Sequence, residues 1–152
     1  AIVTYIMEKK GLTAEEVLNE FNKKSGLLGV SELSNDSREI EDAVAAGNPK
    51  AILANDKYVN TMVERIGSYF VKLGGCDAII FTAGVGENSA TFREEVVAGI
   101  AEALNVKLDK EKNKTRGKYA VISTDDSSIE IVVIPTNEEL VIARDTKRLL
   151  NL

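Results

Sequence analysis

The clearest pattern in the sequence is a run of apolar residues at helical spacing between Lys50 and Leu73. The apolar positions of this run are Val59, Met62, Val63, Ile66, Phe70 and Leu73. Gly74 and Gly75 follow directly, and because glycine commonly ends a helix, they mark its C-terminal end. The pattern therefore predicts one long amphipathic helix over residues 50–73.

Capping signals predict two shorter helices nearer the N-terminus. Thr13, with Glu16 three positions later, is typical of a capping box and opens a helix over the apolar residues that follow. Asp36 similarly precedes a short helix, which Gly47-Asn48-Pro49 ends. Between these helices, Gly26–Ser31 carries two glycines in six residues, and we expect a turn there.

The pattern changes in the second half of the chain. Ala78–Phe81 is a short, continuous apolar run and predicts a strand that is buried on both faces. The further predicted elements are strands over 119–123 and 129–134, a helix from 88 or 89 to 104, and a helix from a second capping box at Thr136 and Glu139 to about residue 150. Strands that alternate with helices predict an α/β fold, here a small sheet flanked by helices. Three strands are fewer than most sheets contain, so we expect part of this domain to lie upstream.

Composition and charge exclude several classes of protein. A chain of 152 residues suits one domain, and we expect residues 1–152 to form a single portion without a dividing linker. The net charge of −5 argues against a nucleic-acid partner, and no apolar run approaches the roughly 18 residues of a membrane span. The single cysteine, Cys76, fits a cytoplasmic protein.

Because the sequence has no histidine, catalytic triads and histidine metal ligands are excluded. Any chemistry must therefore use carboxylates, backbone amides, arginine, lysine or a bound ion.

The segment that follows residues 78–81 is the most informative candidate for a binding site. Gly84 and Gly86 let the backbone approach a ligand without a Cβ, and the start of the next helix offers unpaired N–H groups to a phosphate. The alternative is a tight strand-to-helix turn with an ordinary cap. Ser89 stands where the dinucleotide fingerprint needs its third glycine, and the nearest acid for a ribose is Asp109. The nucleoside-triphosphatase loop is also absent from the sequence.

Two acidic groups at predicted helix starts are the other candidates. In Asp36-Ser37-Arg38, a carboxylate and a guanidinium can converge on a nucleoside, or Asp36 can be an ordinary N-cap with Arg38 in solvent. In Thr136-Asn137-Glu138-Glu139, Glu138 can hold Mg²⁺ together with phosphate oxygens, or it can be an ordinary acid that the helix dipole favours. The local sequence leaves both alternatives open.

Taken in order, these motifs resemble the C-terminal part of proteins of the acetokinase family. The blocks that carry the resemblance are Gly26–Ser31, Asp36–Arg38, Asp77–Ser89 and Ile134–Thr146. The resemblance implies a partial ribonuclease-H-like domain of the superfamily that contains actin, sugar kinases and heat-shock chaperones, in which two domains clasp a nucleotide. It also implies that the matching protein is more than twice as long as this chain.

The resemblance implies roles for particular residues. Asp36, Ser37 and Arg38 would contact the adenosine end of ATP, Gly84, Val85, Gly86, Glu87 and Asn88 would form a second nucleotide-binding loop, and Glu138 would match the magnesium position. The parent enzyme would transfer the γ-phosphoryl group of ATP to acetate, giving acetyl phosphate and ADP, with Mg²⁺ as cofactor. The groups that the family uses for acetate binding and phosphoryl transfer have no counterpart here, so no catalytic residue is assigned in this chain and the isolated fragment is expected to be inactive.

Other functions stay open at this point. A propionate or butyrate kinase would share these motifs, because the acyl chain is recognised in the absent part. A non-catalytic nucleotide-binding module and a dinucleotide-binding oxidoreductase are further alternatives. The segment Ala1–Met7 is apolar from its first residue and has neither an initiator methionine nor a basic leader, so we expect the chain to begin partway through a larger protein. This apolar segment and an exposed sheet edge, with the dimers described for the family, predict a homodimer.

Overall fold

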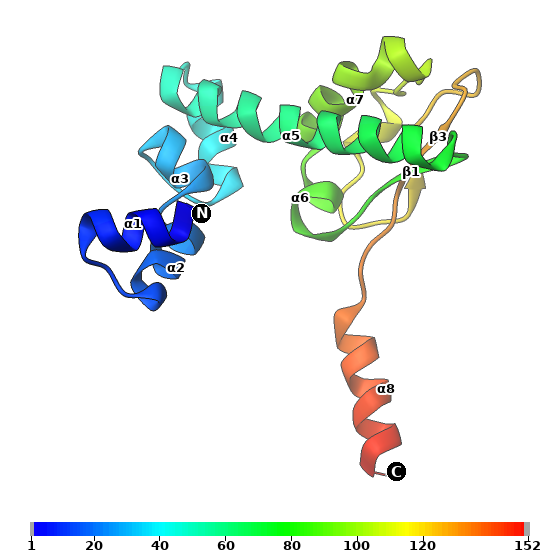
Figure 1. The fold of residues 1–152 in the computed structure, drawn as a ribbon. Coiled ribbons are helices and arrows are strands. Elements are labelled where there is room, and N and C mark those ends of the chain that lie inside the picture. The colour runs from blue at the N-terminus through cyan, green and yellow to red at the C-terminus, as the bar shows by residue number, and fades with distance from the viewer. Residues whose placement is uncertain (1, 151–152) are drawn as a thin grey trace. The chain divides into compact units, whose positions relative to one another are not determined.

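The computed structural model describes residues 2–150, and the chain divides into two compact units, Ala1–Met62 and Val63–Leu152. The first unit is built from helices, and the second combines helices with a small sheet (Figure 1). The helices that begin in the first unit are α1 (Ile2–Lys10), α2 (Ala14–Lys23), α3 (Gly26–Ser31), α4 (Ser37–Ala45) and α5 (Pro49–Leu73). The α5 helix continues into the second unit and confirms the long predicted helix.

Local capping fixes where the helices of the first unit begin. The Thr13 hydroxyl accepts a hydrogen bond from the Glu16 N–H at 3.3 Å, and the Glu16 carboxylate accepts one from the Thr13 N–H at 2.8 Å, so the predicted capping box is confirmed. Asp36 is the N-cap of α4, as predicted. The apolar side chains of this unit with the lowest solvent exposure are those of Val17, Ile40, Ala51 and Ala54. Of the apolar segment Ala1–Met7, Ala1 lies outside the described residues and the rest belongs to α1.

The turn predicted over Gly26–Ser31 was wrong, because this segment forms the helix α3. Gly26 starts the helix with a φ of +61°, which glycine adopts without strain. Glu32 ends it in the left-handed region, with its N–H donating to the Leu28 carbonyl at 2.8 Å. A six-residue helix has too few turns for its apolar spacing to distinguish it from a glycine-rich turn.

The second unit contains a three-stranded mixed sheet in the order β1-β3-β2. Strand β1 (Ala78–Phe81) runs parallel to β3 (Glu130–Val133), and β2 (Ala120–Val121) runs antiparallel to β3. The central strand supplies Ile131 and Val133, both fully buried. The prediction that the first strand is buried on both faces was wrong: β1 lies at the edge of the sheet, and Ile80 is 53% exposed.

The remaining elements of the second unit are α6 (Ala83–Asn88), α7 (Ala90–Leu104), the 3-10 helix η1 (Lys112–Lys114) and α8 (Glu138–Leu150). The Ser89 hydroxyl caps α7 by accepting from the Phe92 N–H at 3.0 Å, which agrees with the predicted start. No helix was predicted for the glycine segment before residue 88, but it forms the short helix α6. No helix within residues 2–150 combines the length and the apolar character needed to span a bilayer.

The second predicted capping box, at Thr136 and Glu139, was also wrong. The side-chain oxygen of Asn137 accepts the hydrogen bond from the Leu140 N–H at 3.0 Å and so caps α8. Thr136 uses its own N–H and hydroxyl in a contact with Glu87, which is described below. Every described residue of α8 is exposed.

Candidate functional site

A pocket of about 600 Å³ lies where two neighbouring parallel strands end. One wall follows β1, and the other follows β3. The lining residues are Ala83, Gly84 and Glu87 on the first wall and Thr136, Asn137, Glu138 and Glu139 on the second. Because β1 and β3 pair in parallel up to Phe81 and Val133, both walls stand at the same, carboxyl edge of the sheet, where ligands bind in open α/β sheets.

The two walls meet through a buried carboxylate. Oε1 of Glu87 accepts hydrogen bonds from the main-chain N–H of Thr136 at 2.7 Å and from the Thr136 hydroxyl at 2.9 Å. These donors, the Thr136 N–H first, lower the pKa of Glu87, although burial would raise it. Glu87 is therefore ionised at neutral pH. The two residues are 49 positions apart, and nothing in the sequence pattern connects them.

The entry to α6 is strained. Ala83, which lines the pocket, has a φ of +59°, a left-handed conformation that disfavours any residue with a Cβ by about 1–2 kcal/mol. Such strain persists only where surrounding contacts hold it, and it is found preferentially at functional sites. This observation adds to the pocket itself as an indication of function.

The two glycines of the motif face different surroundings. Gly84 lines the pocket, and a Cβ at this position would meet no atom within 4 Å. Gly86 is buried, and a Cβ there would lie 3.3 Å from the main-chain carbon of Phe81. Gly86 therefore allows α6 to pack against β1, whereas Gly84 leaves room in the pocket. Val85 is half-buried, and the Asn88 side chain donates to the Gly84 carbonyl at 2.9 Å.

A buried arginine supports α6 from the other side. Arg93 is fully inaccessible, and its guanidinium donates to four neutral oxygens: the Gly86 carbonyl at 2.8 Å, the Asn113 side-chain and main-chain oxygens at 2.8 and 2.6 Å, and the Thr115 carbonyl at 2.8 Å. Burial lowers the pKa of Arg93. Sequence analysis did not identify this role of Arg93. Its position was nevertheless a signal of burial, because Arg93 falls on the apolar face of α7 with Val96 and Val97.

Asp36, Ser37 and Arg38 lie in the first unit, at the start of α4. The Asp36 carboxylate accepts from the Arg38 main-chain N–H at 2.9 Å and from its Nε and Nη2 at 3.1 and 2.6 Å. Asp36 is thus the N-cap of α4, and the Arg38 side chain is 84% exposed, so that the cap leaves a contact between Arg38 and a ligand possible. The guanidinium is therefore accessible from solvent while it is paired with Asp36.

The Asp36–Arg38 contact predicts a measurable titration. The Arg38 side chain is the main cause that lowers the pKa of Asp36 to about 2. Because this pKa lies below the value of about 4 in unfolded chains, the contact stabilises the fold above pH 4, and that stabilisation is lost as the pH falls from about 4 to 2. We expect Arg38→Ala to raise the Asp36 pKa, measured by carbon-detected NMR titration, while the Asp109 pKa stays constant. An unchanged Asp36 midpoint would contradict the assignment.

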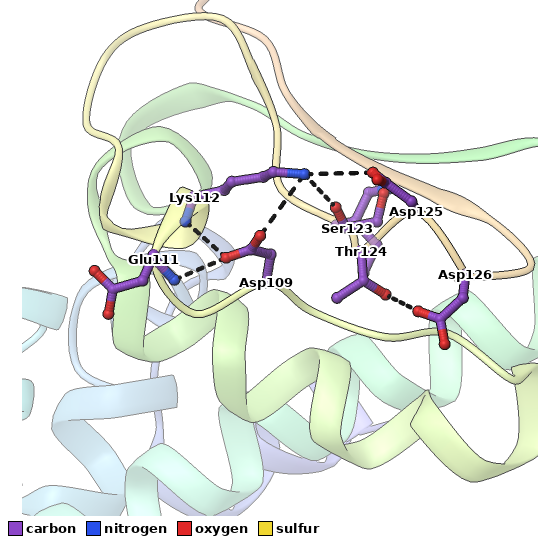
Figure 2. A network of polar contacts seen from close by, with 8 residues as sticks. Asp109, Glu111, Lys112, Ser123, Thr124, Asp125 and Asp126 are labelled. Carbon is purple, nitrogen blue, oxygen red and sulfur yellow. Dashed lines mark hydrogen bonds and ion pairs between the residues drawn. The ribbon is translucent and has the colours of Figure 1, made fainter.

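Asp109, the acid considered for a dinucleotide ribose, belongs to a separate polar network (Figure 2). Its Oδ1 accepts from the N–H groups of Glu111 and Lys112, both at 3.0 Å, and so starts η1. Figure 2 shows the Lys112 ammonium between Asp109 and Asp125, 3.7 Å from an oxygen of each. Asp109 is also not among the residues that line the pocket beside the glycine segment.

The pocket has oxygen donors suited to a hard cation. Across residues 2–150, no cluster of three or more acidic, cysteine or histidine side chains is positioned to hold a metal ion. Mg²⁺, however, commonly takes one or two carboxylates and completes its shell with phosphate oxygens and water. Glu138, exposed at the start of α8 and on the pocket wall, fits that arrangement.

Comparison with known proteins decides the family. The sequence model of the Acetokinase family matches residues 1–144. The chain belongs to the acetokinase family. It is 58% identical over 149 residues to an acetate kinase of Phocaeicola vulgatus, an alignment that covers 98% of this chain and 37% of that protein. It is 51% identical over 149 residues to an acetate kinase of Methanosarcina mazei, covering 98% of this chain and 36% of that protein. The chain thus spans little more than a third of the length of these relatives.

Solved structures of an acetate kinase and a propionate kinase share this fold. The crystal structure of Porphyromonas gingivalis acetate kinase matches with a TM-score of 0.85 and 43% identity, over 98% of this chain and 37% of that chain. A propionate kinase from Francisella tularensis matches with a TM-score of 0.81 and 35% identity, over 93% of this chain and 36% of that chain. The predicted α/β architecture, with a small sheet and flanking helices, is therefore confirmed.

Proposed function

We propose that this chain is the nucleotide- and magnesium-binding part of an acetate kinase, corresponding to its C-terminal portion. The whole enzyme would transfer the γ-phosphoryl group of ATP to acetate, giving acetyl phosphate and ADP. The observation that carries the proposal is that the glycine motif and the segment Asn137-Glu138-Glu139 line one pocket together, at the carboxyl edge of β1 and β3. Membership of the acetokinase family supports the same conclusion.

Each group of residues has a distinct task in this proposal. Gly84 leaves space for the phosphates, and Val85, Gly86, Glu87 and Asn88 complete the nucleotide segment. Asp36, Ser37 and Arg38 contact the adenosine end, where the exposed guanidinium can stack on a purine ring. Glu138 holds Mg²⁺, which when bound neutralises charge on the phosphate oxygens.

The remaining groups of the site would come from the rest of the enzyme. Phosphoryl transfer needs positioned cations around the transferring group and a pocket for the acceptor carboxylate. We assign neither to this chain, so the isolated chain is expected to bind ADP weakly and to lack turnover. We further propose a ribonuclease-H-like domain of the actin and sugar kinase superfamily, a cytoplasmic location and a homodimeric enzyme.

The proposal is tested in a chimera in which this chain replaces the matching 149-residue region of the Phocaeicola vulgatus acetate kinase. We expect the chimera to form acetyl phosphate from ATP and acetate, and the chain alone to form none. A folded chimera without turnover would favour a non-catalytic nucleotide-binding module. Because a propionate kinase has a similar structure, propionate is the second acceptor to assay, and a preference for it would replace acetate as the substrate.

Glu138→Gln tests the magnesium role in the same chimera. Removing the carboxylate charge should lower kcat on the order of 100-fold and raise the Mg²⁺ concentration needed for half-maximal rate. Glu139→Gln is the matched control, since it makes the same change on the same pocket wall. Equal effects of both substitutions on the Mg²⁺ dependence would contradict the assignment of Glu138.

A further inference from the structure

The Glu87–Thr136 contact continues the link between two strands beyond the point where their backbones separate. The last main-chain bond between the strands runs from the Ile134 N–H to the Phe81 carbonyl at 2.9 Å. After it, the first strand turns into α6 and the third continues toward α8. The next link is the Glu87 carboxylate, which takes both donors of Thr136, at 2.7 and 2.9 Å.

Hydrogen bonds of the two preceding residues, Thr136 and Asn137, fix the position of Glu138 at the start of α8. Thr136 is bonded to Glu87, and the adjacent Asn137 caps α8 through the Leu140 N–H at 3.0 Å. Glu138 is the next residue and the first of α8. The α8 helix is exposed along its described length, so it gives the turn little support from packing.

The chemistry of Glu87 argues against a direct contact with phosphate. Glu87 is only 9% exposed, and the Thr136 N–H lowers its pKa, so the side chain is an ionised carboxylate with an occupied oxygen. A carboxylate next to a phosphate oxygen is a repulsive pair. Bonded to two donors of the opposite wall, the same charge forms short, strong hydrogen bonds instead.

We propose that Glu87 is a positioning residue, whose bonds to Thr136 hold the glycine segment Ala83–Asn88 next to the start of α8, where Glu138 lies. These bonds fix the part of the pocket proposed for phosphate relative to the part proposed for Mg²⁺. The inference rests on the proposed function of this pocket. It gives Glu87 a role different from the nucleotide contact that the family resemblance implied. The consequence is that the Glu87–Thr136 contact increases the factor by which Mg²⁺ and ADP strengthen each other's binding.

The test measures ADP affinity with and without Mg²⁺ in the chimera and in its Glu87→Ala and Thr136→Val variants. Both substitutions should reduce the factor by which Mg²⁺ increases ADP affinity. The reduction should be about tenfold for Glu87→Ala and smaller for Thr136→Val, because the valine variant keeps the main-chain donor. Glu87→Gln, whose amide oxygen can still accept both bonds, should restore most of this factor. The double variant should be no worse than Glu87→Ala, because the two side chains act through one contact.

The control substitution is Thr124→Val, which removes a similar bond, from a threonine hydroxyl to the Asp126 carboxylate at 2.7 Å, outside the pocket. It should leave the coupling between Mg²⁺ and ADP unchanged. Should Glu87→Ala fail to fold, Thr136→Val, at an exposed position, decides the question. An unchanged coupling factor in a folded variant would overturn the role of Glu87. Absence of Mg²⁺-dependent ADP binding in the unsubstituted chimera would instead overturn the proposed function.

Discussion

Replacing Arg93 with methionine is expected to lower the free energy of unfolding of this chain by about 3 kcal/mol. The guanidinium satisfies four buried oxygens, on Gly86, Asn113 and Thr115. Methionine fills much of the same volume but donates no hydrogen bond, so these acceptors would be left without partners. The relief of a buried charge offsets part of this loss. Urea unfolding followed by circular dichroism measures the difference.

Two controls separate this effect from a loss of charge alone. Arg65→Met removes the same charge from an exposed position on α5, and we expect it to change the unfolding free energy by less than about 0.5 kcal/mol. Arg93→Lys keeps the charge but cannot reach all four acceptors with one ammonium group, so its effect should be intermediate. If Arg93→Met is as stable as Arg65→Met, the hydrogen bonds of Arg93 do not hold α6.

The second large effect is expected from Gly86→Val. A Cβ at this position already lies 3.3 Å from the main-chain carbon of Phe81, and the two methyl groups of valine would be forced against the same strand. We expect a loss of about 3 kcal/mol in unfolding free energy, because neither β1 nor the short helix can move without breaking the sheet edge. Thermal and urea unfolding of the isolated chain provide the measurement.

Gly84→Val is the matched control for Gly86→Val. It lies in the same helix, but a Cβ there would meet nothing within 4 Å, so stability should change little. Under the proposed function, the new side chain would intrude into the pocket and weaken ADP binding. Comparison of the two variants thus distinguishes a loss of packing, expected for Gly86→Val, from obstruction of the pocket, expected for Gly84→Val. Equal loss of stability in both variants would show that the two glycines do not differ as described.

The elements that could be predicted from the sequence are those that short-range signals determine. The Thr13 capping box, the Asp36 cap and the glycine stop after Leu73 all act within one helical turn of the residues that they affect. The helices α3 and α6 could not be predicted, because six residues carry too little periodicity. The exposure of Ile80 also could not be predicted, since the burial of a strand depends on its neighbours in the sheet.

The sequence indicated which motifs line the candidate site, but it did not indicate the hydrogen bonds that join them. The glycine motif and the Glu138 turn were both recognised, and the parallel pairing of β1 with β3 explains why they share a pocket. The bonds from Glu87 to Thr136 and from Arg93 to Asn113 join residues that are 49 and 20 positions apart. No local rule specifies such pairs. An arginine on an apolar helical face is nevertheless a signal of a buried hydrogen-bonding role, and Arg93 shows its value.

The register of β1 on β3 also has a consequence for the order of folding. In the first unit, each of the helices α1 to α4 contacts its neighbour in the chain, so those contacts close short loops. In the second unit, Ala78 pairs with Glu130, and the intervening chain must be arranged before the strands can meet. Long loop closure slows folding, so we infer that the helices of the first unit assemble early and the sheet late. The pocket at the carboxyl edge of the sheet, whose two walls both depend on that one pairing, is then completed last.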